Sequence, residues 1–319
     1  MYSLVSKTYK SALQKINDFL FNNAAAEQLG VTRIILCGTL LFLACSRQLN
    51  MDQYGLDSII PRDMALSIYP EFYRPAFQYF FWPDALAPVV HFGLIILLLI
   101  ATLGFSNRVL MLITWVLSQG FINRNYSMLF GADLIGTLFL FYLAFTQCHD
   151  KYSLRAFFFK KKVVVPYDEN SFSSQVSSVF FRMMQFQLAI IYMYTGFEKL
   201  KGSTWWDGTA LWTVFANPQF VNYDFIFLRN FPIFFSVGTF ITLLFEVYFP
   251  AMMLFKTGRY IYLALGIFFH LMIGVLLSLM PFSLVMIGIY PLFLDKKDIQ
   301  IIMGWIGRLS EKLSHIKTV

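Results

Sequence analysis

The sequence predicts an all-α, polytopic membrane helical bundle with about eight transmembrane helices and interfacial helices at both ends. Two observations predict this class. Hydrophobic residues make up 58% of the 319 positions and charged residues only 13%, well below the roughly 25% charged residues of a soluble domain. Apolar segments also recur along the whole chain, at lengths approaching the roughly 20 residues that a helix needs to cross a bilayer.

The first element is an N-terminal arm, residues 1–30. Lys7, Lys10 and Lys15 alternate there with apolar residues, and the arm lacks the apolar core of a cleavable signal peptide. This pattern is typical of a helix that lies in the membrane interface, so we expect a cytoplasmic interfacial helix.

The transmembrane domain is predicted to cover residues 31–295. Its third and eighth apolar segments are short, so tilt or adjoining turns must complete them. The eight segments are Val31–Gln48, Leu86–Phe105, Arg108–Ile122, Ala132–Cys148, Ser178–Glu198, Pro232–Phe255, Arg259–Ser278 and Pro281–Leu294.

Residues 296–319 form the last predicted element. Apolar residues from Ile299 to Ile316 recur at helical spacing opposite Arg308 and Lys312. We expect a C-terminal amphipathic surface helix.

Three connections have extra local structure in this interpretation. The outer connections 62–82 and 200–231 are rich in aromatic residues, which favours interfacial or re-entrant helices. The inner connection around Lys160–Asn170 is the third.

The positive charges indicate the orientation. Lysine and arginine gather in alternate loops, whereas the Arg47–Ala85 connection contains five acidic residues against three arginines. By the positive-inside rule both termini face the cytoplasm. The net charge of +7 is thus explained by membrane orientation, and we expect lipid contact and no nucleic acid. The three cysteines, Cys37, Cys45 and Cys148, have no metal-ligand spacing and are predicted to be buried structural thiols.

Ionisable and polar residues interrupt the apolar segments. Each ionisable group at membrane depth costs at least about 2.5–3.5 kcal/mol and needs a partner or a purpose. In the fifth segment Arg182, Gln185 and Lys199 fall within an arc of roughly 100°. Glu246 and His270 lie near the middle of the sixth and seventh segments.

Arg124, Asp133 and the Trp206 turn lie near the outer ends of their segments. We expect these groups to converge with Lys199, Glu246 and His270 on one cavity open to the non-cytoplasmic side. Simpler interpretations stay open. Arg124 with Asp133, or Lys199 with Glu198, would also make plain salt bridges. Lys199 near a helix end would also snorkel to the interface, and a lone buried histidine is more often structural.

Three groups of short motifs carry a family resemblance. The first is Arg182-Met-Met-Gln185, Tyr194-Thr-Gly196-Phe-Glu-Lys199-Leu200 and Trp206-Asp-Gly208. The second is Phe269-His270-Leu-Met, Met280-Pro-Phe282-Ser283-Leu-Val-Met286 and Pro291-Leu-Phe293, and the third is Asn123-Arg124-Asn125 with Gly131-Ala-Asp133. In this order they resemble the membrane domain of the vitamin K-dependent γ-glutamyl carboxylase and the wider HTTM (horizontally transferred transmembrane domain) family. The resemblance covers roughly Thr32 to Asp295.

The resemblance implies an enzyme that uses a reduced quinone of the vitamin K or menaquinone type, with carbon dioxide and oxygen as co-substrates and no metal, to carboxylate a glutamyl substrate. It implies Lys199 as the base, with His270 and Tyr126 as hydrogen-bonding or proton-transfer partners. The remaining residues would bind substrate or quinone: Arg124, Asp133, Arg182, Gln185, Trp206 and Glu246.

Two departures from the carboxylase pattern limit this transfer. Tyr126 stands where the animal carboxylase has a histidine, and we expect no counterpart of its large C-terminal lumenal domain. The alternative is a membrane maturation factor for a secreted peptide or toxin, without carboxylase activity. A transporter is disfavoured because inverted repeats and paired broken helices are absent from the sequence. In either leading interpretation the expected location is a bacterial inner membrane, and the expected partner is a secreted peptide or protein.

Overall fold

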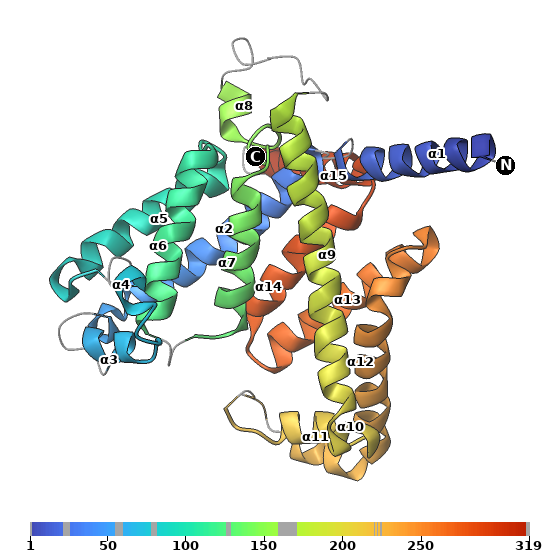
Figure 1. Ribbon diagram of the computed structural model, residues 1–319. Coiled ribbons are helices and arrows are strands. Elements are labelled where there is room, and N and C mark those ends of the chain that lie inside the picture. The colour runs from blue at the N-terminus through green and yellow to red at the C-terminus, as the bar shows by residue number, and fades with distance from the viewer. Residues whose placement is uncertain are drawn as a thin grey trace.

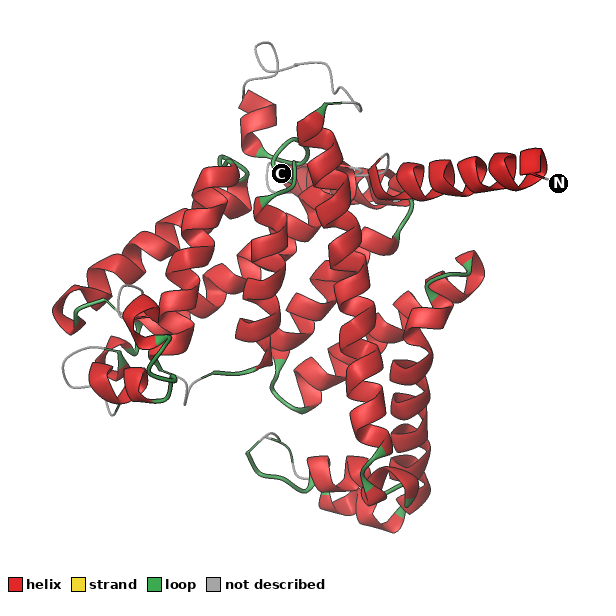
Figure 2. Ribbon diagram, viewed as in Figure 1, coloured by secondary structure: helices red, strands yellow, loops and turns green. Residues whose placement is uncertain are grey.

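The fold is known from a computed structural model that describes residues 2–21, 26–54, 60–77, 82–125, 129–158, 171–219, 221, 223 and 225–316. All regular secondary structure in these ranges is helical, and none of it is strand (Figure 2). The all-α prediction is therefore confirmed.

Every predicted apolar segment forms a helix. Four of the helices, α2, α9, α12 and α13, are long and apolar enough to cross a membrane, while α5, α7 and α14 with η5 are shorter apolar helices. The chain is thus an integral membrane protein, and the count of eight spans stays a prediction. The helices are α2 (Ala26–Gln48), α5 (Ala87–Leu103), α6 (Arg108–Arg124), α7 (Gly131–Ala144), α9 (Phe172–Leu200), α12 (Pro232–Met252), α13 (Lys256–Leu276) and α14 (Met280–Ile289), which continues into η5 (Tyr290–Phe293).

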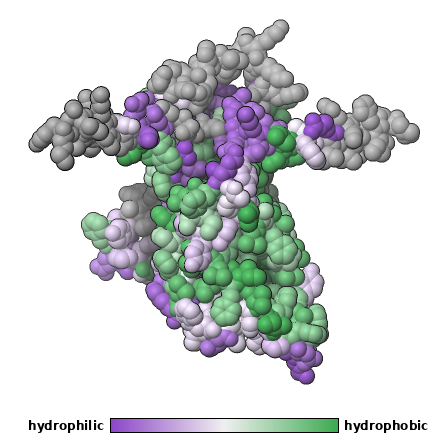
Figure 3. Space-filling view, turned by 90° about the vertical axis from the view of Figure 1, so that its right-hand side faces the viewer, coloured by the Kyte–Doolittle hydropathy of each residue, from purple (hydrophilic) through white to green (hydrophobic). Residues whose placement is uncertain are grey.

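The face of the bundle in Figure 3 is mainly hydrophobic in its middle part, with more hydrophilic residues toward its ends. Large apolar side chains of the membrane helices are exposed, among them Ile233 at 68% and Leu244 at 53% of α12. Side chains of this kind would be costly in water, but they suit the hydrocarbon of a bilayer. They form the lipid-facing surface.

Helix α14 connects two parts of the bundle. On one side it packs against α2 and α7, and α2 packs in turn on α5. On the other side it packs against α13, while α9 packs along α12 (Figure 1). The core between these helices contains Cys37 and Cys148 as predicted, but Cys45 is exposed and the prediction was wrong for that thiol.

The α9–α12 contact depends on a glycine. A Cβ atom on Gly196 would lie 3.0 Å from the backbone nitrogen of Val247, so only glycine allows the two backbones to come this close without a shift. The residues on either side of this contact are consequently within side-chain reach of each other. Helix α9 has 29 residues and is therefore roughly 44 Å long at 1.5 Å per residue.

The two terminal helices, which the sequence predicts to be interfacial, lie at one end of the bundle. Helix α1 (Tyr2–Phe21) extends sideways from the bundle, and α8 (Leu154–Phe158) and α15 (Lys296–Ile316) lie at the same end (Figure 1). Arg182 of α9 fixes α1, because its Nε donates to the carbonyl of Phe19 at 2.9 Å and its guanidinium lies 4.1 Å from the Phe19 ring centroid. Helix α2 begins at Ala26, before the predicted boundary.

The opposite end contains the short helices of the two aromatic connections, as the sequence predicted. These are α3 (Arg62–Ser67), α4 (Arg74–Phe77), α10 (Ser203–Trp206), α11 (Ala210–Phe215) and η4 (Ile226–Asn230). The third connection, around Lys160–Asn170, lies outside the described residues. Which end faces the cytoplasm stays a prediction from the charges.

Candidate functional site

The polar face of α9 contacts different helices along its length. Near its C-terminal end it meets α12, in the middle it meets α13 and η5, and near its N-terminal end it meets α1 and η5. Each of these three contact regions of α9 contains a separate polar group.

At the C-terminal level, Lys199 forms an ion pair with Glu246 of α12. Lys199 Nζ lies 2.6 Å from Glu246 Oε2, and the two side chains are 23% and 9% exposed. The ring of Trp205 lies 5.3 Å from Nζ, within cation–π range. Trp206, another predicted site residue, donates its indole N–H to the carbonyl of Leu200 at 2.8 Å and so fixes the turn after α9.

Two helical turns deeper, Tyr192 joins two further helices. Its hydroxyl lies 2.6 Å from His270 Nε2 on α13 and 2.6 Å from the hydroxyl of Tyr290 in η5. All three side chains are buried. If Tyr290 donates to Tyr192 and Tyr192 donates to His270 Nε2, each of these donors and acceptors is used once. His270 then has its proton on Nδ1.

The Nδ1 atom of His270 is buried and has no hydrogen-bond partner among the described residues. Aromatic rings surround this histidine, with centroids at 5.4 Å for Phe269 and 5.7 Å for Phe282. A buried polar atom without a partner is costly in such surroundings. It offers one hydrogen bond to a ligand that carries an oxygen.

Arg182 and Gln185 lie at the other end of α9. Arg182 Nη1 donates to Gln185 Oε1 at 2.7 Å, and Gln185 Nε2 donates to the carbonyl of Leu292 at 2.6 Å. Together with the contact to Phe19, these bonds hold α1 and η5 against α9. The structure therefore places these two predicted site residues away from Lys199.

Asp133 belongs to a different helix interface. Its Oδ1 lies 2.7 Å from Arg47 Nη2 of α2, and both side chains are largely buried. Arg124 donates to the carbonyl of Ile60 at 2.6 Å. Neither of the two salt bridges left open as alternatives, Arg124–Asp133 and Lys199–Glu198, is formed. Asp133 pairs with Arg47, Lys199 with Glu246 and Glu198 with Lys201.

Of the residues expected at one cavity, the structure pairs Lys199 with Glu246 and places His270 beside Tyr192, two helical turns from Lys199 along α9. The sequence interpretation did not single out Tyr192 or Tyr290 as site residues. Tyr192 is seven residues before Lys199 on the same face of α9, and this spacing was the available signal. No comparable spacing in the sequence pointed to Tyr290 as a member of the site. Tyr126 lies outside the described residues, and none of the described His, Cys, Asp and Glu side chains gather in groups of three that would hold a metal.

Comparisons with known proteins give one family and two relatives. The family model described as "HTTM domain" matches residues 21–297. The uncharacterized protein YitO of Bacillus subtilis (strain 168) is 31% identical over 141 residues, which cover 42% of this chain and 45% of YitO. The sporulation-delaying protein SdpB of the same organism is 26% identical over 229 residues, which cover 69% of this chain and 68% of SdpB. The chain thus spans less than half of the length of YitO, and no solved structure gives a significant match.

Proposed function

The chain belongs to the HTTM-domain family, and from that membership we propose that it is a membrane-embedded, carboxylase-like enzyme whose base is Lys199. The observation that carries the proposal is the ion pair of Lys199 and Glu246 at 2.6 Å, at an interface between two membrane helices. An ionisable pair in such a position supports the hypothesis of a functional site.

For Lys199 to act as a base, Glu246 would serve as the acceptor of its proton. An ammonium group cannot accept a proton, so the amine must first lose one. The carboxylate of Glu246 is within hydrogen-bond distance and is positioned to take that proton. The neutral amine of Lys199 would then accept a proton from a bound substrate, while Trp205 and the aromatic neighbours restrict water.

The residues around His270 fit the head group of a quinone. His270 Nδ1 offers a single unused hydrogen bond among apolar rings, which suits a flat, apolar molecule with oxygen atoms at its edge. When bound, a reduced quinone of the vitamin K type would supply, together with oxygen, the driving force for proton abstraction from a glutamyl side chain, and carbon dioxide would supply the new carboxyl group. Tyr192 and Tyr290 would hold the imidazole in one tautomer and orientation.

A second candidate is a membrane factor for the maturation of a secreted peptide, without carboxylase activity. The similarity to SdpB, a sporulation-delaying protein, favours it. Both candidates include a secreted peptide as partner, and they differ in whether Lys199 does chemistry on a quinone.

The test uses the full chain in membrane vesicles. Radiolabelled bicarbonate is supplied with reduced menaquinone and a glutamate-containing peptide, and label in the peptide is counted. Lys199→Ala should abolish incorporation, whereas Lys201→Ala, which removes an ion pair of the same 2.6 Å length on the surface, should retain it. Equal activity in the two variants would exclude Lys199 as the base. Absence of both incorporation and co-purified quinone from functional wild-type protein would favour the maturation factor.

A further inference from the structure

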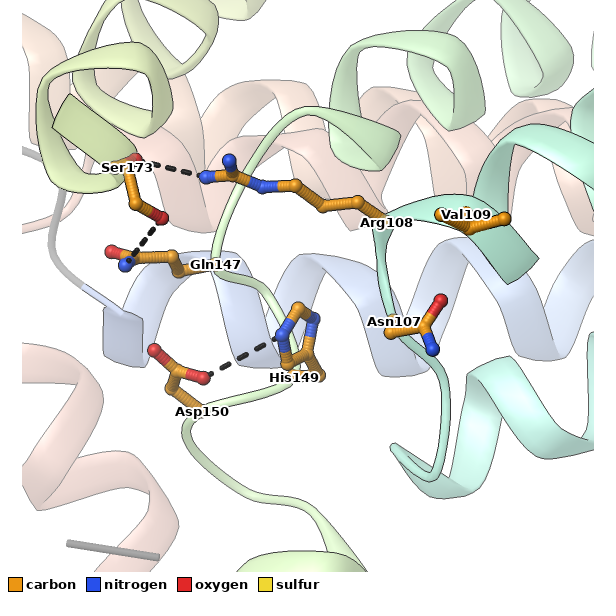
Figure 4. Close-up of a pocket in the computed structure, with 7 residues that line it drawn as sticks. All are labelled: Asn107, Arg108, Val109, Gln147, His149, Asp150 and Ser173. Carbon is orange, nitrogen blue, oxygen red and sulfur yellow. Dashed lines mark hydrogen bonds and ion pairs between the residues drawn. The ribbon is translucent and has the colours of Figure 1, made fainter. Parts of the chain in front are cut away.

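A polar hollow lies far from Lys199. It has a volume of about 340 Å³ and lies where α6 begins, where the segment after α7 turns, and where α9 begins. Ser173 and Lys199 are at opposite ends of α9, roughly 39 Å apart at 1.5 Å per residue. The lining residues are Asn107, Arg108, Val109, Gln147, His149, Asp150 and Ser173 (Figure 4).

The guanidinium of Arg108 has unused hydrogen-bond donors in this hollow. Its Nη2 donates to the carbonyl of Ser173 at 2.9 Å, and no carboxylate in the described part of the chain lies within salt-bridge distance of it. Figure 4 shows the guanidinium reaching across the hollow toward Ser173, with its second terminal nitrogen directed away from that bond. A guanidinium with unused N–H groups is suited to bind the oxygens of a phosphate.

The surrounding charge is positive on balance. Burial lowers the pKa of His149, Asp150 opposes this shift, and Arg155, Arg33 and Arg108 add to it. Three arginines thus act on this site against one carboxylate, whose Oδ1 lies 3.7 Å from the imidazole. The field in the hollow favours an anion.

Two buried polar atoms at the hollow have no partner among the described residues, Gln147 Oε1 and His149 Nδ1. Gln147 Nε2 lies 3.1 Å from Ser173 Oγ. With the Gln147 amide turned by 180°, the hydroxyl of Ser173 would donate to Gln147 Oε1 and leave the amide N–H₂ for a ligand. The lining can thus add neutral donors to the guanidinium.

The hollow opens beside lipid-facing side chains. Val109 lines it and is 64% exposed, and Ile113, one turn further along α6 on the same face, is 43% exposed. The rings of Phe105 and Phe158 stack nearby with centroids 6.5 Å apart. A hydrocarbon chain would therefore have an apolar path that starts at the charged groups.

We propose that this hollow binds the phosphate group of an anionic membrane lipid, with Arg108 on the phosphate and an acyl chain along Val109 and Ile113. The site lies at the end of the bundle that contains α1, α8 and α15, which the lysine and arginine distribution predicts to face the cytoplasm. Anionic lipids are enriched in that leaflet. A soluble phosphate compound would use Arg108 equally, but would gain nothing from Val109.

The experiment uses the full chain purified in mild detergent and washed free of lipid. Fluorescent phosphatidylglycerol is titrated into the wild type and four variants, and inorganic phosphate and phosphatidylcholine are titrated as competitors. Arg108→Gln should weaken phosphatidylglycerol binding about tenfold, and Asp150→Asn should tighten it about threefold by removing the opposing charge. The matched control Arg229→Gln, an exposed arginine at the other end of the bundle, should leave binding unchanged.

Val109→Asn decides between lipid and soluble phosphate. It should weaken binding of phosphatidylglycerol but not of inorganic phosphate. Competition by inorganic phosphate at millimolar concentration, with no effect of Val109→Asn, would overturn the lipid assignment, as would equal binding of phosphatidylcholine. Equal affinities for Arg108→Gln and Arg229→Gln would overturn the site itself. If Arg108→Gln does not fold, the opposite shifts expected from Asp150→Asn and Val109→Asn still decide.

Discussion

Lys199 Nζ and Glu246 Oε2 lie 2.6 Å apart across the α9–α12 interface, in the stretch where Gly196 brings the two backbones together. Lys201 and Glu198 form an ion pair of the same length on the surface nearby, with side chains 69% and 44% exposed. The chain therefore contains a buried pair and an exposed pair that differ mainly in their surroundings.

Glu246→Gln should destabilise the protein by about 3 kcal/mol, because it leaves the ammonium of Lys199 without a counter-charge in a site of low polarity. This is the lower end of the usual range, since Lys199 keeps 23% exposure. Glu198→Gln should have no measurable effect. Unfolding in detergent, followed by tryptophan fluorescence, would compare them. A double substitution, Lys199→Gln with Glu246→Gln, should be milder than Glu246→Gln alone, and an equal or larger loss would contradict a buried ion pair.

Gly196→Ala should lower the free energy of unfolding by about 1–3 kcal/mol, because the new methyl group meets Val247 at 3.0 Å and forces α9 and α12 apart. Gly93→Ala in α5 is the control, since nothing lies within 4 Å of its added Cβ. There the higher helix propensity of alanine should stabilise by up to about 1 kcal/mol. Thermal unfolding of the purified variants measures both. The same sign of change at the two glycines would show that the α9–α12 contact is not tight.

Tyr192→Phe should destabilise by about 2–3 kcal/mol, because it removes two buried hydrogen bonds and leaves His270 Nε2 without a partner. Tyr290→Phe removes only one and should cost about 1 kcal/mol. Quinone content of the purified protein, measured by mass spectrometry, should fall more for Tyr192→Phe. If both variants retained the quinone content of the wild type, His270 would not take part in quinone binding.

The stability of the protein should depend on His149 at mildly acidic pH. Burial lowers the pKa of this imidazole in the folded state, with Arg155, Arg33 and Arg108 adding to the shift and Asp150 opposing it. The unfolded chain therefore binds a proton first, near its ordinary pKa of about 6.5, and stability falls as the pH drops through that value toward the lower folded pKa. Above both values His149 has no such effect. In His149→Gln the melting temperature should fall less between pH 7 and pH 5 than in the wild type, and parallel curves would contradict this account.

The positions of the helices could be predicted from the sequence because the length and composition of the apolar segments indicate them directly. The side-chain contacts between helices could not be predicted. Helical periodicity tells which residues of α9 share a face, but not which other helix covers that face, and Lys199 and Glu246 are 47 positions apart. Glu198 is adjacent to Lys199 in the sequence but is not its ion-pair partner. Adjacent residues on a helix point about 100° apart, so Glu198 contacts Lys201, three residues further on, instead of Lys199.

The family motifs added what periodicity could not, since they singled out Lys199 and His270 among several polar residues. They did not identify Tyr192, Tyr290 or Arg47. These residues are defined by contacts between helices distant in sequence, such as the 86 positions between Arg47 and Asp133.

At roughly 44 Å, α9 is longer than the hydrocarbon layer of a bilayer is thick, about 30 Å. Its last turn, with Lys199, and helix α10 after it, with Trp205 and Trp206, would lie where acyl chains give way to head groups, the depth that tryptophan prefers. Under the function we propose, a quinone dissolved in the membrane would approach that amine from the side, and a peptide substrate would approach it from water. Two reactants that share no common solvent would meet there without either having to leave its own.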